Sequence, residues 1–162
     1  MDETNFWQIV ERVHRAAGDD MELKCRIIER DISALPAAEA LDFARLFDTM
    51  MGRAYRWPLW GAAFVINGGC GDDTFSDFRA SLISRGREAF ESAQADPDSL
   101  ADAEFDAEAW FYEGYQYAVG RGVKTATKGE RPSPAPFSDP SGQDWKEDEV
   151  YGLFPRLAAK FG

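Results

Sequence analysis

Residues 57–90 read WPLWGAAFVINGGCGDDTFSDFRASLISRGREAF, and this stretch decides how the rest of the chain is interpreted. The Trp57-Pro58 step predicts a helix that begins at Pro58, because proline suits a first helical turn and disfavours a helical residue before it. The apolar run up to Ile66 predicts that this helix is buried on most sides. A short buried strand is the alternative, since periodicity alone does not separate the two.

The Asn67-Gly68-Gly69 segment predicts the end of this helix, because glycine adopts the left-handed conformation without steric cost. Asp72 or Asp73 is expected to cap the next helix by accepting hydrogen bonds from its first free amides. The apolar residues of that next helix share one face at spacings of three and four: Phe75, Phe78 and Leu82. Its polar residues are expected to point mostly to solvent: Asp77, Arg79 and Ser81. After Gly86 a further helix is expected.

The glycine-rich turn has two interpretations. In the functional one, exposed amides and charged side chains hold a small ligand or a peptide, and the candidate site consists of Trp60, Asn67, Cys70, Asp72, Asp73, Arg79 and Arg85. In the structural one, the aspartates are caps, the glycines end a helix and the arginines pair with nearby carboxylates. The structural interpretation is favoured, because capping requires these residue types at these places. Phosphate binding is disfavoured, since two aspartates occupy the anion position and no P-loop lysine follows.

The string LWGAAFVINGGCGDDTFSDFRASLISRGREAF, with DPDSLA at residues 96–101 and the N-terminal MDETNFW, resembles the bacterial domain-of-unknown-function family 4240. The resemblance covers most of residues 1–120. It implies a small, mainly helical, soluble domain. No activity, cofactor or catalytic residue is carried over from this family.

Three helices are expected before residue 57. The first starts at Asp2 or Thr4 and ends at Gly18, the second is capped by Asp19 or Asp20, and the third begins at Pro36. Their apolar faces contain Phe6, Ile9, Val10, Val13 and Ala17, then Met21, Cys25, Ile28, Ile32 and Leu35, then Phe43, Phe47, Met50 and Ala54. Trp7 lies beside the first face and is expected at its edge or partly exposed. Together these patterns predict an all-α, compact single-domain multi-helix bundle.

The titratable residues outside the turn suggest no reactive centre. His14, the only histidine, lies opposite the apolar face of the first helix and is interpreted as a surface residue. Cys25 is interpreted as a small buried apolar group, and the two cysteines form no metal-like pair. The acidic residues of 98–108 lack the glycine-hinged spacing of a calcium loop and are interpreted as a solvated face. No metal site and no cofactor are predicted.

The C-terminal part of the chain changes in character. The aromatic segment WFYEGYQYAV at 110–119 predicts a helix in which Gly114 permits close approach of a neighbour, at a core boundary or an interface. Residues 120–143 are rich in glycine and proline and predict a long loop or linker. A short helical tail from Trp145 to Phe161 is expected to dock on the same domain. We therefore expect a helical core at residues 1–119, and the loop with its docking tail at 120–162.

Composition limits the partners. The chain of 162 residues suits a single domain, and its net charge of −11 opposes binding to nucleic acid or to an anionic membrane surface. A basic protein partner remains compatible with this charge. There is no signal peptide, and the longest apolar run, Ala62 to Ile66, is far too short to cross a bilayer. A cytoplasmic location with reduced thiols is expected.

Two functions are weighed. The favoured one is a non-enzymatic protein-interaction or regulatory module, because the chain has no G-x-S-x-G, H-E-x-x-H or C-x-x-C motif. The alternative is a small-ligand-binding protein or hydrolase that uses the Asn67–Asp73 turn. In that hypothesis Asp72 or Asp73 acts as a base and Arg79 or Arg85 holds an anion. The aspartate pair as a cation ligand is a third and weaker hypothesis. The oligomeric state is left open.

Overall fold

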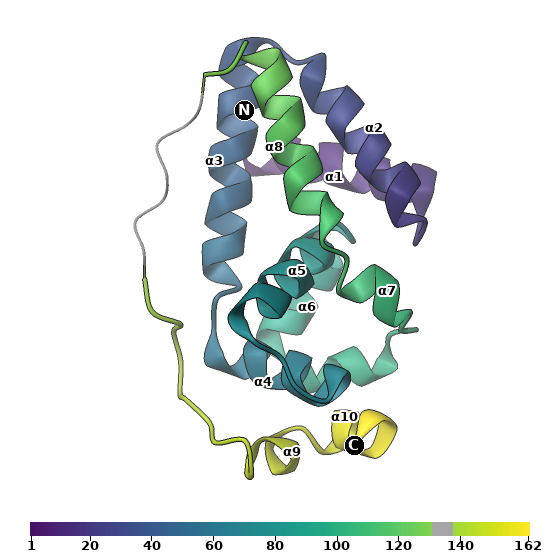
Figure 1. The fold of residues 1–162 in the computed structure, drawn as a ribbon, viewed down its shortest axis with the longest axis vertical. Coiled ribbons are helices and arrows are strands. Elements are labelled where there is room, and N and C mark those ends of the chain that lie inside the picture. The colour runs from purple at the N-terminus through teal and green to yellow at the C-terminus, as the bar shows by residue number, and fades with distance from the viewer. Residues whose placement is uncertain (131–137) are drawn as a thin grey trace.

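A computed structural model describes residues 1–130 and 138–162 of the chain (Figure 1). All regular elements in this part are helical, and the single β-bridge, between Arg56 and Ser141, is isolated. The elements are α1 (Glu3–Ala17), α2 (Met21–Ser33), α3 (Ala37–Arg53), α4 (Trp57–Asn67), α5 (Asp72–Ile83), α6 (Arg87–Ala95), the 3-10 helix η1 (Pro97–Asp102), α7 (Ala107–Trp110), α8 (Gly114–Ala126), α9 (Val150–Leu153) and α10 (Pro155–Phe161). The predicted all-α single domain is confirmed, and the strand alternative for residues 58–66 is wrong.

The first three helices begin where the sequence predicts. The carboxylate of Asp2 accepts a hydrogen bond from the amide of Asn5 and caps α1, and Asp20 caps α2 by accepting from the amide of Leu23. Pro36 precedes the first residue of α3. Trp7 is buried, with 3% of its surface exposed, so its expected partial exposure is wrong. Its ring packs on those of Phe6 and Phe90.

Helix α8 lies alongside α2 and α3 and closes the N-terminal half of the molecule (Figure 1). The close approach to α2 occurs at Gly122, where a Cβ atom would lie 2.9 Å from Cβ of Ile32 and 3.0 Å from the Glu29 carbonyl oxygen. Only glycine fits at this crossing without displacement of α2. At Gly114, where close approach of a neighbouring helix was expected, a Cβ would instead meet the ring of Tyr112.

Two predictions for residues 110–143 are wrong. The aromatic segment is not one helix, because α7 ends at Trp110 and α8 starts at Gly114. The loop does not start at residue 120, because α8 continues to Ala126 and buries Val123 against the core. The apolar residues of this helix outweigh its three glycines, and the contact with α2 requires one of them, Gly122. Residues 131–137 of the expected loop lie outside the described part of the chain.

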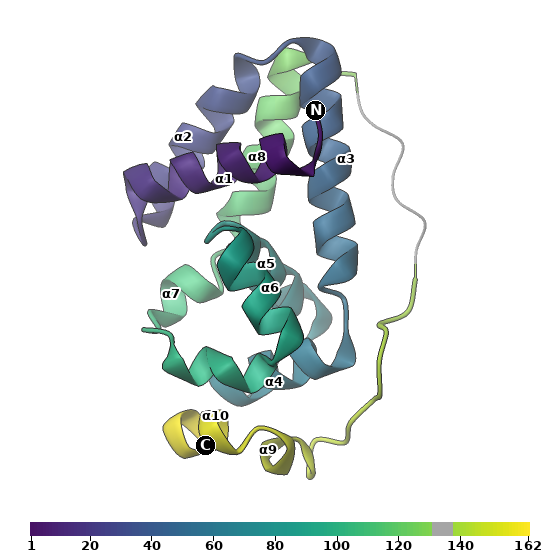
Figure 2. The ribbon, with the colours of Figure 1, turned by 180° about the vertical axis from the view of Figure 1, so that it is seen from behind.

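The C-terminal segment packs against the opposite end of the molecule from the α2–α8 crossing (Figure 2). Its helices α9 and α10 contact α4 and η1, and they bury Val150, Phe154 and Leu157. The acidic run of residues 98–108 is therefore not wholly a solvated face. Asp98 accepts hydrogen bonds from α10, Asp102 pairs with Arg156, and Asp106 caps α7. Among the described residues, no helix has both the length and the apolar character that crossing a membrane requires.

Candidate functional site

The glycine turn, defined here as Asn67–Asp73, joins α4 to α5. Gly68 and Gly69 have positive φ angles of 68° and 131°, which end α4. The side-chain amide of Asn67 donates to the Gly69 carbonyl at 2.9 Å, and the indole Nε1 of Trp60 donates to the Cys70 carbonyl at 2.8 Å. These bonds attach the turn to the helix that precedes it.

The two aspartates of the turn do not cap α5, which corrects the sequence prediction. The N-cap is Gly71, and no side chain accepts a hydrogen bond there. Asp72 and Asp73 instead occupy the first turn of the helix, where their negative charges interact favourably with the helix dipole. The Asp72 carboxylate also accepts a hydrogen bond of 3.2 Å from the hydroxyl of Tyr55.

Arg79 is buried, although the sequence placed it mostly towards solvent. Its Nη1 donates to the Met51 carbonyl at 2.9 Å, and its Cζ lies 4.4 Å and 4.9 Å from the ring centroids of Tyr55 and Phe75. Burial lowers the pKa of this guanidinium from its ordinary value, and the charge of Asp72 opposes that shift. The side chain thus connects α5 to the end of α3, with an aromatic ring at each side.

Aromatic rings surround this junction. Trp60 stacks on Trp57 with ring centroids 5.1 Å apart and on Phe75 at 5.0 Å. Tyr55 stacks on both Trp60 and Phe75. Six of the seven candidate residues therefore lie at this junction or on the elements that enter it, and five of these six have side chains that bond to the chain itself. These five are Trp60, Asn67, Cys70, Asp72 and Arg79.

The remaining two candidates differ from this group. Asp73 is exposed in the first turn of α5. Arg85 leaves the other end of α5, forms an ion pair with Asp19, and places its Cζ 4.6 Å from the Trp110 ring centroid. The structure therefore does not bring Arg85 together with the glycine turn.

Near Arg85 lies a polar cluster that sequence reasoning missed, and we name it the amine cluster: His14, Asp19, Lys24, Ser84 and Arg85. Lys24 is fully buried between α1, α2 and α5. Its Nζ donates to Nδ1 of His14 at 2.9 Å and to the hydroxyl of Ser84 at 3.4 Å. The Ser84 hydroxyl in turn donates to the Ser81 carbonyl at 2.6 Å.

Burial lowers the pKa values of two groups in the amine cluster, the Lys24 amine and the His14 imidazole. It lowers the pKa of Lys24 to about 8, and the positive charge of Arg85 acts in the same direction. Burial, followed by the charges of Lys24 and Arg85, lowers the pKa of His14 to about 4. At neutral pH the imidazole is therefore neutral and accepts from the Lys24 ammonium. The interpretation of His14 as an unpartnered surface residue is wrong.

One sequence signal for this cluster exists. Lys24 lies three residues after Met21 and four before Ile28, on the apolar face of α2. A lysine at such a position either extends to solvent or is buried with a partner. The partners come from α1 and α5, so the sequence alone does not identify them.

The one partly exposed thiol is poorly suited to nucleophilic chemistry. Burial, with the charges of Asp72 and Asp77, raises the pKa of Cys70 to about 12. A thiolate is the reactive form of cysteine, and at neutral pH this thiol is almost entirely protonated. Cys25 is buried as predicted. Among the described residues, no group of three or more His, Cys, Asp or Glu side chains is placed to hold a metal ion.

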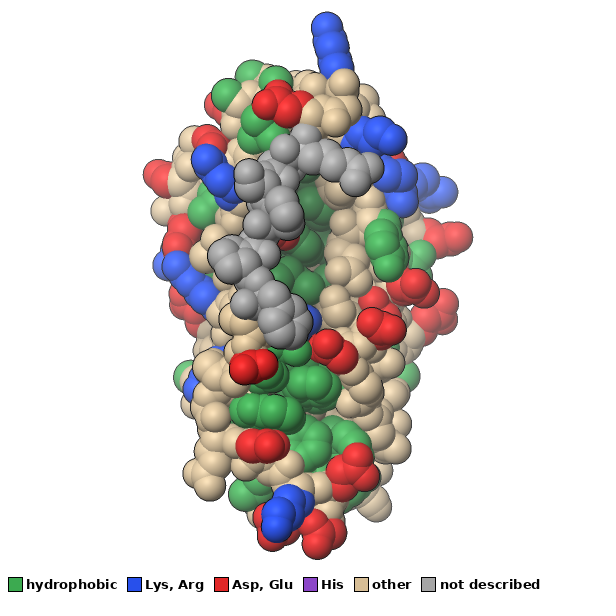
Figure 3. Space-filling model, turned by 60° about the vertical axis from the view of Figure 1, so that its left-hand side comes forward, with side chains coloured by type: hydrophobic (Ala, Val, Ile, Leu, Met, Phe, Trp, Pro, Cys, Tyr) green, Lys and Arg blue, Asp and Glu red, His purple; other side chains and the backbone are tan. Residues whose placement is uncertain are grey.

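A hollow lies between α3 and α8, and we name it the α3–α8 groove. It has a volume of about 790 Å³. Its apolar lining comes from both helices: Ala44, Phe47, Met51, Val119 and Val123. Its polar lining consists of Asp48, Gln116, Tyr117, Arg121, Lys124 and Glu130. Apolar side chains run along the middle of this side of the molecule, with charged side chains at either edge (Figure 3).

Comparison with known families gives one result. A family model described as "Protein of unknown function (DUF4240)" matches residues 1–123. The chain belongs to the DUF4240 family. No curated protein and no solved structure matches it significantly. The resemblance noted from the NGGC-x-DD string is confirmed.

The DUF4240 match covers the elements from α1 to α7 and most of α8. The glycine turn and the amine cluster lie wholly within it, and so does the apolar lining of the groove. The C-terminal helices α9 and α10 lie beyond it. The DUF4240 part therefore contains the glycine turn, the amine cluster and most of the groove lining, and the C-terminal helices pack on it from outside the matched residues.

Proposed function

We propose that the protein is a non-enzymatic protein-interaction module and that the α3–α8 groove binds an amphipathic helix of its partner. The observation that carries the proposal is the apolar lining of a groove between two helices, which residues 1–130 and 138–162 leave open. Clefts with a mainly apolar lining and a few polar groups are the usual places where proteins bind ligands.

The spacing of the lining residues favours a helical ligand. Phe47 and Met51 lie four residues apart on α3, and Val119 and Val123 lie four apart on α8. Residues at this spacing form ridges, and a third helix can pack its own ridges into the groove between them. Recognition of an amphipathic helix in an apolar groove is a recurring mode of protein binding.

The charged edges of the groove favour a particular arrangement of partner charges. Arg121 and Lys124 stand on the α8 side, while Asp48 stands on the α3 side. A helix with acidic residues towards α8 and a basic residue towards α3 complements both edges. The net charge of −11 additionally favours the approach of a partner that is basic overall.

The aromatic segment that the sequence marked as a possible interface contributes one residue to this surface. Trp110 and Tyr115 are buried in the core, whereas Tyr117 is 55% exposed and lines the groove. A tyrosine at the edge of a groove can pack its ring on a ligand while its hydroxyl stays in water.

The alternative, a small-ligand site or hydrolase at the glycine turn, has less support. The groups expected to act on a ligand there mostly bond to the chain itself, and Arg85 is directed to the amine cluster. What favours it is the Nε of Arg79, which is buried without a hydrogen-bond partner beside Asp72. A ligand that accepts this hydrogen would have to enter between the rings of Tyr55 and Phe75.

The test requires a partner and a variant that fills the groove without disturbing the fold. Gly120 lines the groove, and a Cβ added there meets no described atom within 4 Å. Gly120→Leu therefore places an isobutyl group in the ligand's space. Gly52→Leu is the matched control, because Gly52 is also helical and open but does not line the groove.

Proteins that co-purify with the wild-type chain from its source are identified, and each is then purified and titrated against the three proteins by calorimetry. We expect Gly120→Leu to weaken binding of the true partner about tenfold or more, and Gly52→Leu to leave it unchanged. Equal binding by wild type and Gly120→Leu contradicts the assignment of the groove. A gain in affinity after replacement of residues 131–137 by a linker of equal length would identify residues 131–137 as a competitor of the partner.

A further inference from the structure

The C-terminal segment, residues 141–162, contacts one face of the DUF4240 part. We name this the docking face and define it by α4 and η1 with the adjoining Ala103 and Phe105. Both α9 and α10 pack on α4, and α10 also packs on η1 (Figure 2). The docking face lies inside the matched residues 1–123, and the segment lies outside them. The contacts between the docking face and the segment are as specific in side-chain fit and hydrogen bonding as those of a recognition site.

Gly61 forms a notch in the docking face. A Cβ atom at this position would lie 2.7 Å from Cε2 of Phe154, 2.9 Å from Nε1 of Trp145 and 3.1 Å from Cγ2 of Val150. All three of these nearest atoms belong to the C-terminal segment. The absence of a side chain at residue 61 therefore makes room for the segment, at a position where glycine within a helix otherwise costs stability.

The main chain of the docking face is also recognised. The indole Nε1 of Trp145 donates to the Trp57 carbonyl at 2.6 Å. The main chain of Ser141 forms two hydrogen bonds: its amide donates to the Tyr55 carbonyl at 3.0 Å, and its carbonyl accepts from the Trp57 amide at 2.8 Å. These bonds fix the position of the segment along α4.

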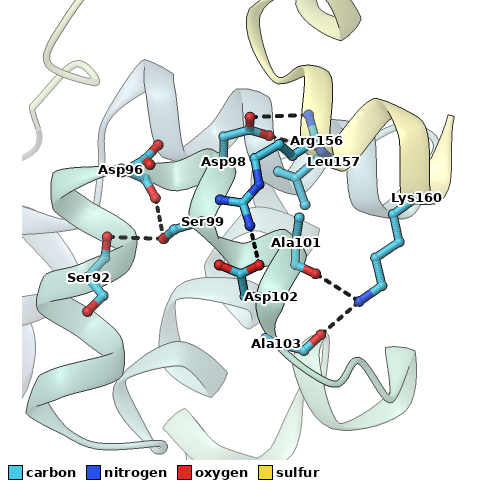
Figure 4. A network of polar contacts seen from close by, with 10 residues as sticks. All are labelled: Ser92, Asp96, Asp98, Ser99, Ala101, Asp102, Ala103, Arg156, Leu157 and Lys160. Atoms are coloured by element: carbon cyan, nitrogen blue, oxygen red, sulfur yellow. Dashed lines mark hydrogen bonds and ion pairs between the residues drawn. The ribbon is translucent and has the colours of Figure 1, made fainter.

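Each partner satisfies the free helix-end groups of the other (Figure 4). The Asp98 carboxylate on η1 accepts from the amides of Arg156 and Leu157, at 3.2 Å and 2.9 Å, in the first turn of α10. In the other direction, Nζ of Lys160 donates to the carbonyls of Ala101 and Ala103, at 3.0 Å and 2.8 Å, where η1 ends. Arg156 additionally pairs with Asp102. Such reciprocal capping specifies both sequence and orientation.

We infer that the docking face is a peptide-binding surface whose ligand is the segment 141–162, and that it accepts this segment from a second copy of the chain. Every copy carries both halves of the interaction. Exchange between two copies reproduces the same contacts and generates a two-fold arrangement. A chain's own segment competes at the high effective concentration that its covalent connection provides. Binding in trans therefore becomes visible when one chain has a free docking face and the other a free segment.

Two full-length variants create this situation. Gly61→Leu blocks the notch and leaves its own segment free, and the double variant Phe154→Ala/Leu157→Ala weakens the segment and leaves the docking face free. Each is tested alone and in an equimolar mixture by sedimentation velocity, with one chain labelled. We expect monomers of each variant alone and a concentration-dependent heterodimer in the mixture.

Two controls make the result specific. Gly52→Leu in place of Gly61→Leu keeps its own segment bound, so the mixture should form about tenfold less heterodimer or lower still. Two differently labelled copies of the Phe154→Ala/Leu157→Ala chain should not associate. Should Gly61→Leu fail to fold by circular dichroism, Asp98→Lys replaces it, because it removes the cap of α10 and repels Arg156. Absence of a heterodimer between folded variants overturns the inference, as does equal association of the two segment-defective chains.

Discussion

The glycine turn and the amine cluster differ in how they arise. In the turn, unusual residues are neighbours in sequence, and their hydrogen bonds join groups at most 17 residues apart: within the turn, to Trp60 of α4 and to the hydroxyl of Tyr55. In the amine cluster, ordinary residues from α1, α2 and α5 meet in the interior, and Lys24 is buried beside a neutral His14. The conspicuous sequence marks a joint between helices, whereas the buried Lys24–His14 pair arises from contacts that no single segment encodes.

The largest expected effect concerns the ring that holds the turn. Trp60→Ala should lower the free energy of unfolding by about 3 to 4 kcal/mol, because it removes three stacking contacts and the hydrogen bond to the Cys70 carbonyl. Trp60→Phe, which retains an aromatic ring, should cost about half of that. Urea denaturation measures both. A loss below 1 kcal/mol for Trp60→Ala would show that the turn is not attached through this indole.

The next effect is a pH dependence from Lys24. Its folded pKa of about 8 lies below its ordinary value of 10.5, so the unfolded chain binds the proton more tightly between these values. Stability should therefore rise with pH across the window from 8 to 10.5, by about 3 kcal/mol in total. Lys24→Met should remove this rise and be no less stable than wild type at pH 7, because no charge is then buried.

The difference in unfolding free energy between wild type and Lys24→Met, measured as a function of pH, isolates this contribution from other groups that titrate above pH 9. A difference that stays constant from pH 7 to pH 10.5 contradicts the buried-ammonium interpretation. His14 adds a second window. Its pKa is lowered from 6.5 to about 4, so stability should fall as pH decreases through that range, and His14→Phe should remove that part of the fall.

A smaller effect comes from the acceptor of the cluster. His14→Ala should cost about 2 kcal/mol, because the Lys24 ammonium loses its closest acceptor inside the fold. His14→Asn offers an amide oxygen near the position of Nδ1 and should recover most of that loss. Thermal unfolding of the two variants makes the comparison. Identical losses for alanine and asparagine would show that packing, and not the hydrogen bond, makes this position matter.

The smallest effect is expected in the turn itself. Asp73→Ala should cost less than about 0.5 kcal/mol, since Asp73 lies in the first turn of α5 but does not cap it. Asp20→Ala, which removes the true N-cap of α2, should cost about 1 kcal/mol and serves as the reference. Equal losses in the two variants would restore the capping role that the sequence suggested for Asp73.

These contrasts show which features follow from sequence. Helix starts at Asp2 and Asp20 were predictable, because capping is a local interaction between residues three apart or fewer. The end of α4 at Gly68 was predictable for the same reason. The start of α3 after Pro36 was predictable because the fixed φ angle of proline suits the beginning of a helix. The N-cap of α5 was not, because serine-like and acidic residues favour both the cap and the first turn, and only the conformation of Gly71 separates them.

What escaped prediction depends on tertiary contact. In the sequence, Gly122 suggests a flexible loop. In the structure it lies within α8, and the residue is glycine because Ile32 leaves no room for a side chain. Arg79 has the spacing of an exposed residue, yet the rings of Tyr55 and Phe75 enclose it. Lys24 became a functional candidate only once α1 and α5 placed His14 and Ser84 beside it. Each case requires a partner distant in the chain.

The most direct test of this contrast is an NMR titration of the Lys24 side chain, followed through its 13Cε and 15Nζ resonances in the folded protein. Loss of these resonances in the Lys24→Met variant provides the assignment control. We predict a midpoint near pH 8 for wild type. A midpoint at the ordinary value of 10.5 would contradict the account, because it would mean that the interior leaves this amine unperturbed.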